Sequence, residues 1–172
     1  MLAKSLADVA DYTDLFISVI SEISEKIKRR NPREKKVTRN QRKKTRNMNE
    51  NDITYKIRGA IFKVYNELGP GLLESVYEAA LLYQLRKDGL QVESQKKLDV
   101  YYDGNLLPVD FRLDIIVEDM VIIELKSVEM LKDVHKKQLL TYLKISGKKV
   151  GLLVNFNTSD ITKDIVRIVN GL

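Results

Sequence analysis

The segment FRLDIIVEDMVIIELKS, residues 111–127, constrains the fold more than any other part of this sequence. Two runs rich in Ile, Val, Leu and Phe are separated there by a short stretch at 118–120. This composition predicts a buried β-hairpin. Three charged residues nevertheless interrupt the apolar runs, namely Asp114, Glu124 and Lys126. Because a buried charge is costly unless it is paired or bound to a metal, they predict a polar site on the hairpin.

Counting faces along the two strands brings these charges together. Successive side chains of a strand point to opposite faces, so Asp110, Arg112 and Asp114 share one face, and Glu124 shares a face with Lys126. A three-residue loop at 118–120 would place Asp114 opposite Glu124 and Arg112 opposite Lys126. A two-residue turn would instead separate the carboxylates. With the longer loop, six apolar residues should pack together on the other face: Phe111, Leu113, Ile115, Val121, Ile123 and Leu125.

Two carboxylates facing each other across a hairpin suit a divalent cation. Like charges in directly opposed positions destabilise a strand pair, and a cation between them removes that penalty. The 172 residues include no cysteine and a single histidine, His135, which excludes thiolate centres and centres built on several histidines. Carboxylate ligands favour Mg²⁺, Mn²⁺ or Ca²⁺. With Lys126 polarising a water or stabilising phosphate charge, the pattern favours metal-dependent phosphodiester hydrolysis over an exposed Glu–Lys pair.

The rest of the compact part predicts an α/β fold. A helix should run from an N-cap at Asp52 to Gly69, and a second helix should span 70–89 and be ended by Gly89. Strand signals follow over 97–102 and 107–117, with a turn at Asp103 and Gly104, and then over 120–127. We expect a helix over about 130–146, a buried strand over 148–156 and a closing helix over 159–172. The predicted order is α-α-β-β-β-α-β-α, with a central mixed sheet of about four strands.

The N-terminal part differs in composition from this domain. Residues 1–30 carry an apolar stripe at helical spacing and predict one amphipathic helix. Residues 31–50 predict a basic linker, and 26–46 alone hold twelve Lys or Arg against one acid, Glu34. That segment is either a flexible tether or an arm that binds nucleic-acid phosphates. Residues 47–172 have a net charge near −1. The third expected unit is the domain over 51–172, which lies within this range.

An Asp on one strand followed by Glu-x-Lys on the next resembles the PD-(D/E)xK nuclease superfamily. More closely, GLLESVY, with Gly71, Glu74 and Tyr77, is similar to the signature of the GxxExxY proteins, a prokaryotic branch of that superfamily. The segments FRLDIIVED, VIIELKSVE, VHKKQLLTYLK and VGLLVNFN are also similar to blocks of that branch, and the resemblance covers about 52–172. It implies a restriction-endonuclease-like core. Leu113 stands where the superfamily's name has a proline.

The resemblance also implies roles for individual residues. Asp114 and Glu124 would bind Mg²⁺ or Mn²⁺, Lys126 would be the catalytic lysine, and Glu74 would complete the site. Glu74 has an alternative role, because an acid in the first turn of a helix is favoured by the helix dipole. Residues near these would support the site or contact nucleic acid: Gln138 and Tyr142, which resemble the QxxxY motif of RecB-like nucleases, His135 and Arg112. Tyr77 belongs to the signature, but an aromatic residue at helical spacing is more often part of a hydrophobic core.

We therefore expect a cytoplasmic, Mg²⁺-dependent nuclease that acts on DNA, with RNA as the alternative substrate. No apolar run is long enough for a membrane span, and no signal-peptide pattern opens the chain. One alternative is a catalytically silent relative that binds nucleic acid on the same fold. Another is a protein-assembly module whose N-terminal helix binds a partner or a second copy.

Overall fold

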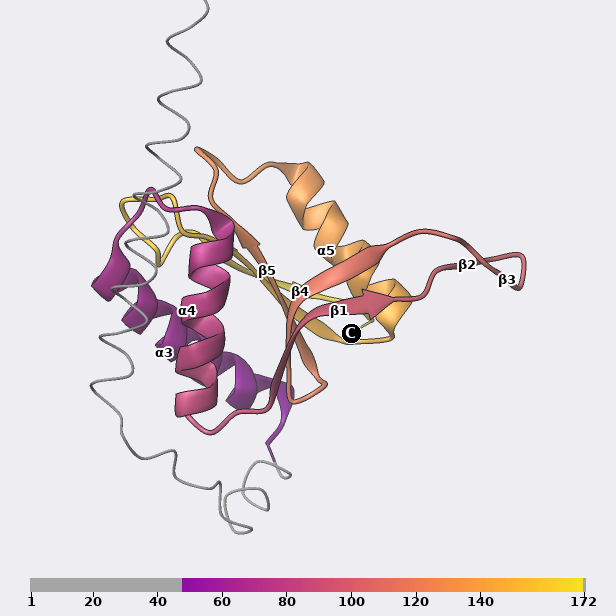
Figure 1. Cartoon of the computed structure of the whole chain (residues 1–172), viewed down its shortest axis with the longest axis horizontal. Coiled ribbons are helices and arrows are strands. Elements are labelled where there is room, and N and C mark those ends of the chain that lie inside the picture. The colour runs from indigo at the N-terminus through magenta and orange to yellow at the C-terminus, as the bar shows by residue number, and fades with distance from the viewer. Residues whose placement is uncertain (1–47, 172) are drawn as a thin grey trace, which may run out of the picture. The chain divides into compact units, whose positions relative to one another are not determined.

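A computed structural model describes residues 48–171. Within them, three helices pack on one mixed sheet of five strands (Figure 1). The helices are α3 (Glu50–Leu68), α4 (Glu74–Lys87) and α5 (Asp133–Ser146). The strands are β1 (Val92–Leu98), β2 (Tyr101–Tyr102), β3 (Asn105–Leu106), β4 (Phe111–Val117), β5 (Val121–Lys126), β6 (Val150–Asn155) and β7 (Ile165–Val169). The expected helix over 1–30 and the linker up to residue 47 lie outside the described residues.

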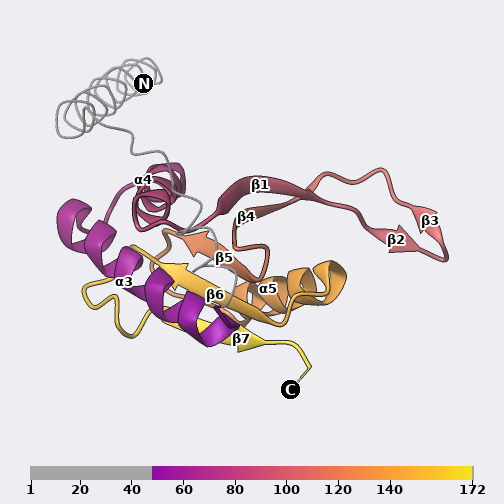
Figure 2. The same cartoon turned by 90° about the horizontal axis from the view of Figure 1, so that it is seen from below.

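The sheet has the strand order β1-β4-β5-β6-β7, and only the β5–β6 pair is parallel. Helices α3 and α4 cover one face and α5 covers the other (Figure 2). Strand β5 lies at the centre and its first five residues are buried, as expected of a strand covered on both faces. This arrangement confirms the predicted α/β fold. None of the helices in the described part is long and apolar enough to cross a membrane.

The predicted hairpin register is confirmed. Val117 pairs with Val121, and the three-residue connection Glu118–Met120 places Glu118 and Asp119 in the left-handed region, each with a φ of 52°. The loop closes with a hydrogen bond of 3.0 Å from the Met120 N–H to the Val117 carbonyl. The odd loop length therefore places Ile115 opposite Ile123 and Ile116 opposite Ile122, as predicted. The predicted pairs Asp114–Glu124 and Arg112–Lys126 lie beyond the end of the β4–β5 ladder.

Strand alternation fails at one point in β4. Ile115 and Val117 pack toward α3 and α4, but Leu113 packs toward α5 with Ile116, against the prediction. The β1–β4 ladder skips Asp114 and its opposite residue Gln95, which has a φ of 51°. The β4–β5 ladder likewise ends at Ile115. Because neither neighbour pairs with Asp114 in the ladder, the strand can rotate there.

Two further predictions about elements were wrong. The expected closing helix over 159–172 is a turn followed by β7, so the sheet has five strands. Residues 165–169 are Ile-Val-Arg-Ile-Val, and β-branched residues favour strands over helices. The expected strand over 97–102 is also interrupted: β1 ends at Leu98, and β2 pairs with β3 around the turn at Asp103 and Gly104, which was predicted.

The helix boundaries follow local capping. Asn49, and not Asp52, is the N-cap of α3; its side chain accepts from the Asp52 N–H at 3.0 Å, while Asp52 accepts from the Asn49 N–H at 3.2 Å. This reciprocal pair is a capping box. Gly69 ends α3 as predicted, with a φ of 69° that a glycine adopts without strain. The second helix begins only at Glu74, so residues 70–73 form a loop.

The packing of α5 on the sheet generates a testable prediction. A Cβ added at Gly151 in β6 would lie 2.9 Å from a methyl carbon of the buried Leu139 in α5. We expect Gly151→Ala to lower the free energy of unfolding by about 1–3 kcal/mol, measured by denaturant titration.

Gly59→Ala is the matched control for that substitution. Gly59 lies within α3, and a Cβ there meets nothing within 4 Å. This change should raise the free energy of unfolding by about 0.5–1 kcal/mol, because alanine favours a helix interior. If Gly151→Ala were also neutral or stabilising, α5 would not pack on β6 as described.

Candidate active site

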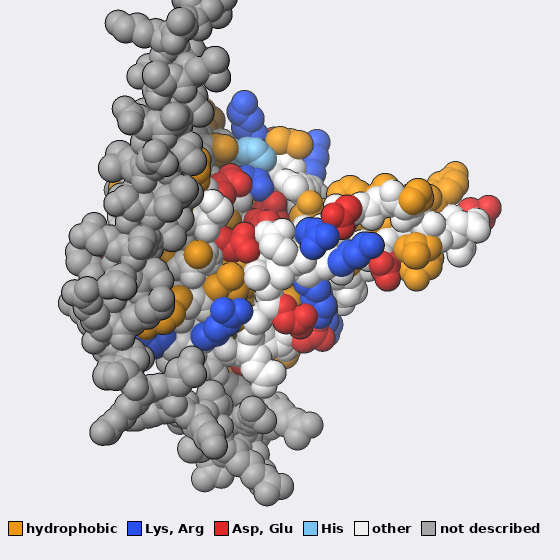
Figure 3. Space-filling view, in the orientation of Figure 1, with side chains coloured by type: hydrophobic (Ala, Val, Ile, Leu, Met, Phe, Trp, Pro, Cys, Tyr) orange, Lys and Arg blue, Asp and Glu red, His pale blue; other side chains and the backbone are white. Residues whose placement is uncertain are grey.

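The candidate site lies where β5 ends and β4 turns away from it. A cleft of about 690 Å³ opens between this end of the sheet, the loop before α4 and the first turns of α4. Its polar lining is mostly acidic or neutral and includes Glu74, Glu78, Gln95, Asp114, Ser127 and Asn157. On this face of the molecule, acidic side chains gather in the middle, with Lys and Arg side chains around them (Figure 3).

The side chain of Asp114 accepts a backbone hydrogen bond from β5 at the point where the β4–β5 ladder has ended. Its Oδ2 atom accepts from the backbone N–H of Leu125 at 2.9 Å. Burial raises the pKa of Asp114, and the charge of Glu74 raises it further. The Leu125 N–H and the charge of Lys126 act in the opposite direction. The carboxylate is thus tied to β5 by one oxygen.

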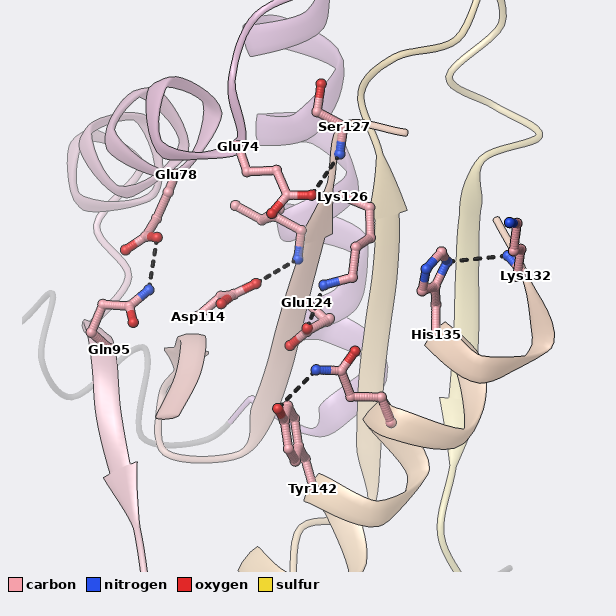
Figure 4. A network of polar contacts seen from close by, with 12 residues as sticks. Glu74, Glu78, Gln95, Asp114, Glu124, Lys126, Ser127, Lys132, His135 and Tyr142 are labelled. Atoms are coloured by element: carbon pink, nitrogen blue, oxygen red, sulfur yellow. Dashed lines mark hydrogen bonds and ion pairs between the residues drawn. The ribbon is translucent and has the colours of Figure 1, made fainter. Parts of the chain in front are cut away.

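Glu124 and Lys126 form a largely buried ion pair beside Asp114 (Figure 4). The Lys126 Nζ atom donates to the Glu124 Oε1 atom at 2.7 Å. Glu124 is only 2% exposed, and its Oε2 atom has no hydrogen-bond partner among the described residues. An unpaired buried carboxylate oxygen is unfavourable by itself, so this atom is available to a cation or a donor that is not part of the chain.

The environment shifts the pKa values of both partners. Burial and then the nearby charge of Asp114 raise the pKa of Glu124 to about 7, despite the ion pair with Lys126. Burial lowers the pKa of Lys126, but the hydrogen bond and charge of Glu124 outweigh it, so that this pKa is raised overall. Lys126 therefore stays protonated near neutral pH and can stabilise negative charge, whereas it is a poor general base.

Glu74 is held toward the same place by the chain that follows β5. Its Oε1 atom accepts from the Ser127 N–H at 3.0 Å, and the Ser127 hydroxyl donates to the Leu72 carbonyl at 2.6 Å. The N-cap Leu73 makes no side-chain cap hydrogen bond, so Glu74 does not complete a capping box. Glu74 does lie in the first turn of α4, where the helix dipole favours an acid. Its exposed carboxylate belongs to the wall of the cleft.

Tyr77 fixes the loop that leads into α4. The Tyr77 hydroxyl donates to the Gly69 carbonyl at 2.7 Å and accepts from the Leu72 N–H at 3.1 Å. Its ring is fully buried and stacks on Phe156 with ring centroids 4.3 Å apart. Gly71, at a φ of 95°, lies within this loop. The spacing of these three residues thus has a local explanation. Gly71 lies in the turn, Glu74 accepts a hydrogen bond from the chain after β5, and Tyr77 holds the loop in place.

Asn155 supports the site and was missed by sequence reasoning. It is 1% exposed at the end of β6, where its Oδ1 atom accepts from the Val128 N–H at 3.0 Å and its Nδ2 atom donates to the Val128 carbonyl at 2.9 Å. This amide continues the β5–β6 pairing beyond Lys126 and thereby fixes Ser127. An asparagine that ends the apolar run VGLLV was the available signal.

Glu78 and Gln95 were also missed. The Gln95 side-chain amide donates to Glu78 at 2.9 Å, and both line the cleft beside Asp114 (Figure 4). Burial, and then the charge of Asp114, raise the pKa of Glu78, against the lowering effect of the Gln95 hydrogen bond. Glu78 lies one turn after Glu74 on α4, which was a usable signal. Gln95 shows no pattern in the sequence that distinguishes it.

The other predicted residues lie in different surroundings. Gln138 donates to the Tyr142 hydroxyl at 2.8 Å, so the predicted neighbours on α5 do interact. His135 accepts from the Lys132 N–H at 3.1 Å and helps to begin α5, apart from the three charges of the hairpin (Figure 4). Arg112 does not pair with Lys126: it lies opposite Lys97 of β1 and binds Asp110 at 3.0 Å.

The carboxylates of the site suit a divalent cation that takes few ligands from the protein. Across residues 48–171, no three His, Asp or Glu residues are close enough together to hold a metal ion, so Glu74 is not gathered with Asp114 and Glu124 into one ligand set. The unpartnered Glu124 Oε2 atom beside Asp114 does fit a hard cation, since Mg²⁺ often takes one or two carboxylates and keeps several waters. Two carboxylates, with Glu74 nearby, are therefore compatible with Mg²⁺ or Mn²⁺.

A family model described as the PD-(D/E)XK nuclease superfamily matches residues 51–168, which is more than half of the chain. This match suggests a metal-dependent hydrolase that acts on nucleic acids, in a superfamily whose members generally use Mg²⁺ or Mn²⁺. Comparisons with curated proteins and with solved structures found no match.

The raised pKa of Glu124 predicts a pH-dependent stability. Between the ordinary value near 4.5 and about 7, the folded chain holds a proton on Glu124 that the unfolded chain has lost. This carboxyl therefore lowers the free energy of unfolding as pH rises through that range. Without divalent cations, the stability of Glu124→Gln relative to wild type should increase by about 1–3 kcal/mol between pH 5 and pH 8.

Urea titrations at the two pH values, with EDTA present, measure that difference. Glu67→Gln serves as a control, because Glu67 is exposed on α3. A gap between wild type and Glu124→Gln that is the same at pH 5 and pH 8 would contradict the raised pKa.

Proposed function

This chain belongs to the PD-(D/E)XK nuclease superfamily, and on that premise we propose that it is a Mg²⁺-dependent nuclease that hydrolyses phosphodiester bonds in DNA. RNA is the alternative substrate class. The observation that carries the proposal is the buried Glu124–Lys126 pair beside Asp114, with one Glu124 oxygen left unpartnered. A buried charged cluster of this kind is unfavourable for folding, which argues that it is retained for chemistry.

In the proposed mechanism, Asp114 and Glu124 would hold Mg²⁺ or Mn²⁺, and Glu74 would contribute from the cleft wall. A bound divalent cation would supply Lewis acidity and favour the ionised form of a water. Lys126 is protonated and donates to Glu124, so it is suited to orient the attacking water and to stabilise the developing phosphate charge. Ser127 and Asn155 act through hydrogen bonds that fix the chain after Lys126.

We further infer membership of the GxxExxY branch. The support is the geometry of its signature residues: Glu74 accepts from the Ser127 N–H, while Tyr77 binds both ends of the loop that contains Gly71. Through these contacts, Glu74 and Tyr77 connect α4 and the loop before it to the end of β5. Gln138 and Tyr142 would support the site from α5.

A cleavage assay tests the function directly. Wild type should degrade at least one of linear, circular or single-stranded DNA, or RNA, when Mg²⁺ or Mn²⁺ is present. Glu124→Ala and Lys126→Ala should each reduce the rate by about 100-fold or more, because each removes charge from the reacting centre. The controls Glu67→Ala and Lys87→Ala change exposed residues and should retain the wild-type rate.

If wild type leaves every substrate intact in that assay while still binding nucleic acid, the enzyme proposal fails. The catalytically silent binding module on the same fold then becomes the better description. Equal rates for wild type and Glu124→Ala would instead mean that cleavage occurs at another site or comes from a contaminant.

Metal binding can be tested without catalysis. A cation that binds only the folded chain raises the melting temperature. Mg²⁺ or Mn²⁺ at millimolar concentration should therefore raise the melting temperature of wild type at pH 8, and should have little effect on Glu124→Gln. An equal rise in both proteins would mean that the cation binds away from Glu124.

A further inference from the structure

Strands β1 and β4 continue beyond the sheet as a projecting two-stranded arm, which comprises residues 98–111 and ends in the β2–β3 hairpin (Figures 1 and 2). The arm extends the two strands that contribute Gln95 and Asp114 to the cleft. Two-stranded hairpins without a covering layer are only marginally stable in water. An exposed arm of this kind therefore calls for a functional explanation.

The arm exposes large apolar side chains on both of its faces. Tyr101 is 64% exposed, Tyr102 is 74% exposed and Leu106 is 56% exposed. Tyr101 pairs with Leu106, and Tyr102 pairs with Asn105, so the two tyrosines point to opposite faces of the ribbon. Hydrophobic side chains are visible along the arm in Figure 3. A partner with a flat apolar surface would require such side chains on one face only.

The charge of the arm limits what it can contact. Residues 98–111 contain Asp99, Asp103 and Asp110 and no Lys or Arg. Such a segment repels a phosphate backbone, which is bound through Lys and Arg. The same charge disfavours the pairing of two identical arms in a homodimer. What the tyrosines can still bind in a nucleic acid is the face of a base, because every base stacks on an aromatic ring.

Positive charge is placed at the base of the arm instead. Lys97 of β1 and Arg112 of β4 lie directly opposite each other, and Arg112 also binds Asp110. Like charges in opposed positions destabilise a strand pair. Asp110 offsets part of that repulsion, and an anion such as a phosphate beside Lys97 would relieve the rest. This pair lies between Asp114 and the arm along β4, so it is positioned to hold a backbone phosphate next to the candidate site.

Contacts connect the arm to the rest of the site. Phe111, at the root of the arm, packs edge-on against Tyr142 of α5 with ring centroids 6.1 Å apart. Leu106 precedes Asp114 by eight positions, which span at most roughly 26 Å. A nucleic-acid strand bound at the carboxylates would therefore pass the Lys97–Arg112 pair and reach the tyrosines.

From these observations, and resting on the proposed nuclease function, we infer that the arm stacks on unpaired bases. The substrate class is then nucleic acid with a single-stranded segment next to the scissile phosphate, such as a flap, an overhang or a single strand. Duplex DNA is a poor ligand for the arm, because its bases are stacked inside and its phosphates face outward.

Binding measured in EDTA, where cleavage does not occur, tests this inference. Fluorescence anisotropy of the full chain with a single-stranded oligonucleotide and its duplex, at several salt concentrations, should show tighter binding of the single strand. Tyr101→Ser combined with Tyr102→Ser should weaken single-strand binding about tenfold or more and leave the salt slope unchanged. Lys97→Gln should instead reduce the salt slope by about one.

The outcomes separate the inference from the proposed function. Unchanged single-strand affinity in the double variant, or an equal loss for duplex and single strand, would overturn the inference. So would a change from dimer to monomer in light scattering, since the arm would then be a protein interface. Cleavage of DNA without any single-strand preference would leave the nuclease standing and remove the arm's role. Tyrosine-dependent binding of single strands without cleavage of any substrate would support the role of the arm and overturn the proposed nuclease function.

Both tyrosines are largely exposed, so the double variant should retain the wild-type melting temperature. Tyr101→Phe combined with Tyr102→Phe provides a second control. This change keeps the rings and should retain single-strand binding, which a role based on the hydroxyl groups would not allow.

Discussion

The hydrogen bond from the Leu125 N–H to the Asp114 carboxylate determines how the central strands of this domain part. Up to Ile115 and Ile123 the hairpin is an ordinary antiparallel ladder. At the next pair a side chain replaces the main chain as acceptor, so that β4 leaves β5 while the Leu125 N–H stays satisfied. The cleft lies at this opening, and both Asp114 and Leu125 line it.

Polar groups beyond the end of β5 make this opening tolerable. A sheet that stops abruptly leaves buried backbone groups without partners, which is costly. Here the Asn155 amide satisfies Val128, and the Ser127 N–H reaches across to Glu74. The same contacts that complete the backbone hydrogen bonding also hold an acid from α4 near the acids of the hairpin. The hydrogen bonds that stabilise the end of β5 therefore also position Glu74 for its proposed role.

Much of the fold could be predicted from periodicity and turn residues, and the site less completely. The register of Val117 with Val121 followed from loop length alone, and the approach of Glu124 to Lys126 followed from alternation. The closing helix was mistaken because Ile165–Val169 can be fitted to either period, and the choice depends on β6 needing a partner. Gln95 acts through a tertiary contact that no local pattern records, and the signal for Asn155 was limited to its place at the end of an apolar run.

The central position of β5 has a consequence for how the domain can move. Strands with neighbours on both sides and cover on both faces open only when the whole domain unfolds, whereas projecting ribbons and loop ends open in isolation. Glu124 belongs to the first category, and the arm belongs to the second. Amide exchange should therefore be slowest in β5, around Glu124, and fastest in the arm. We therefore expect the arm to change conformation when a ligand binds, while Glu124 and the rest of β5 keep their positions.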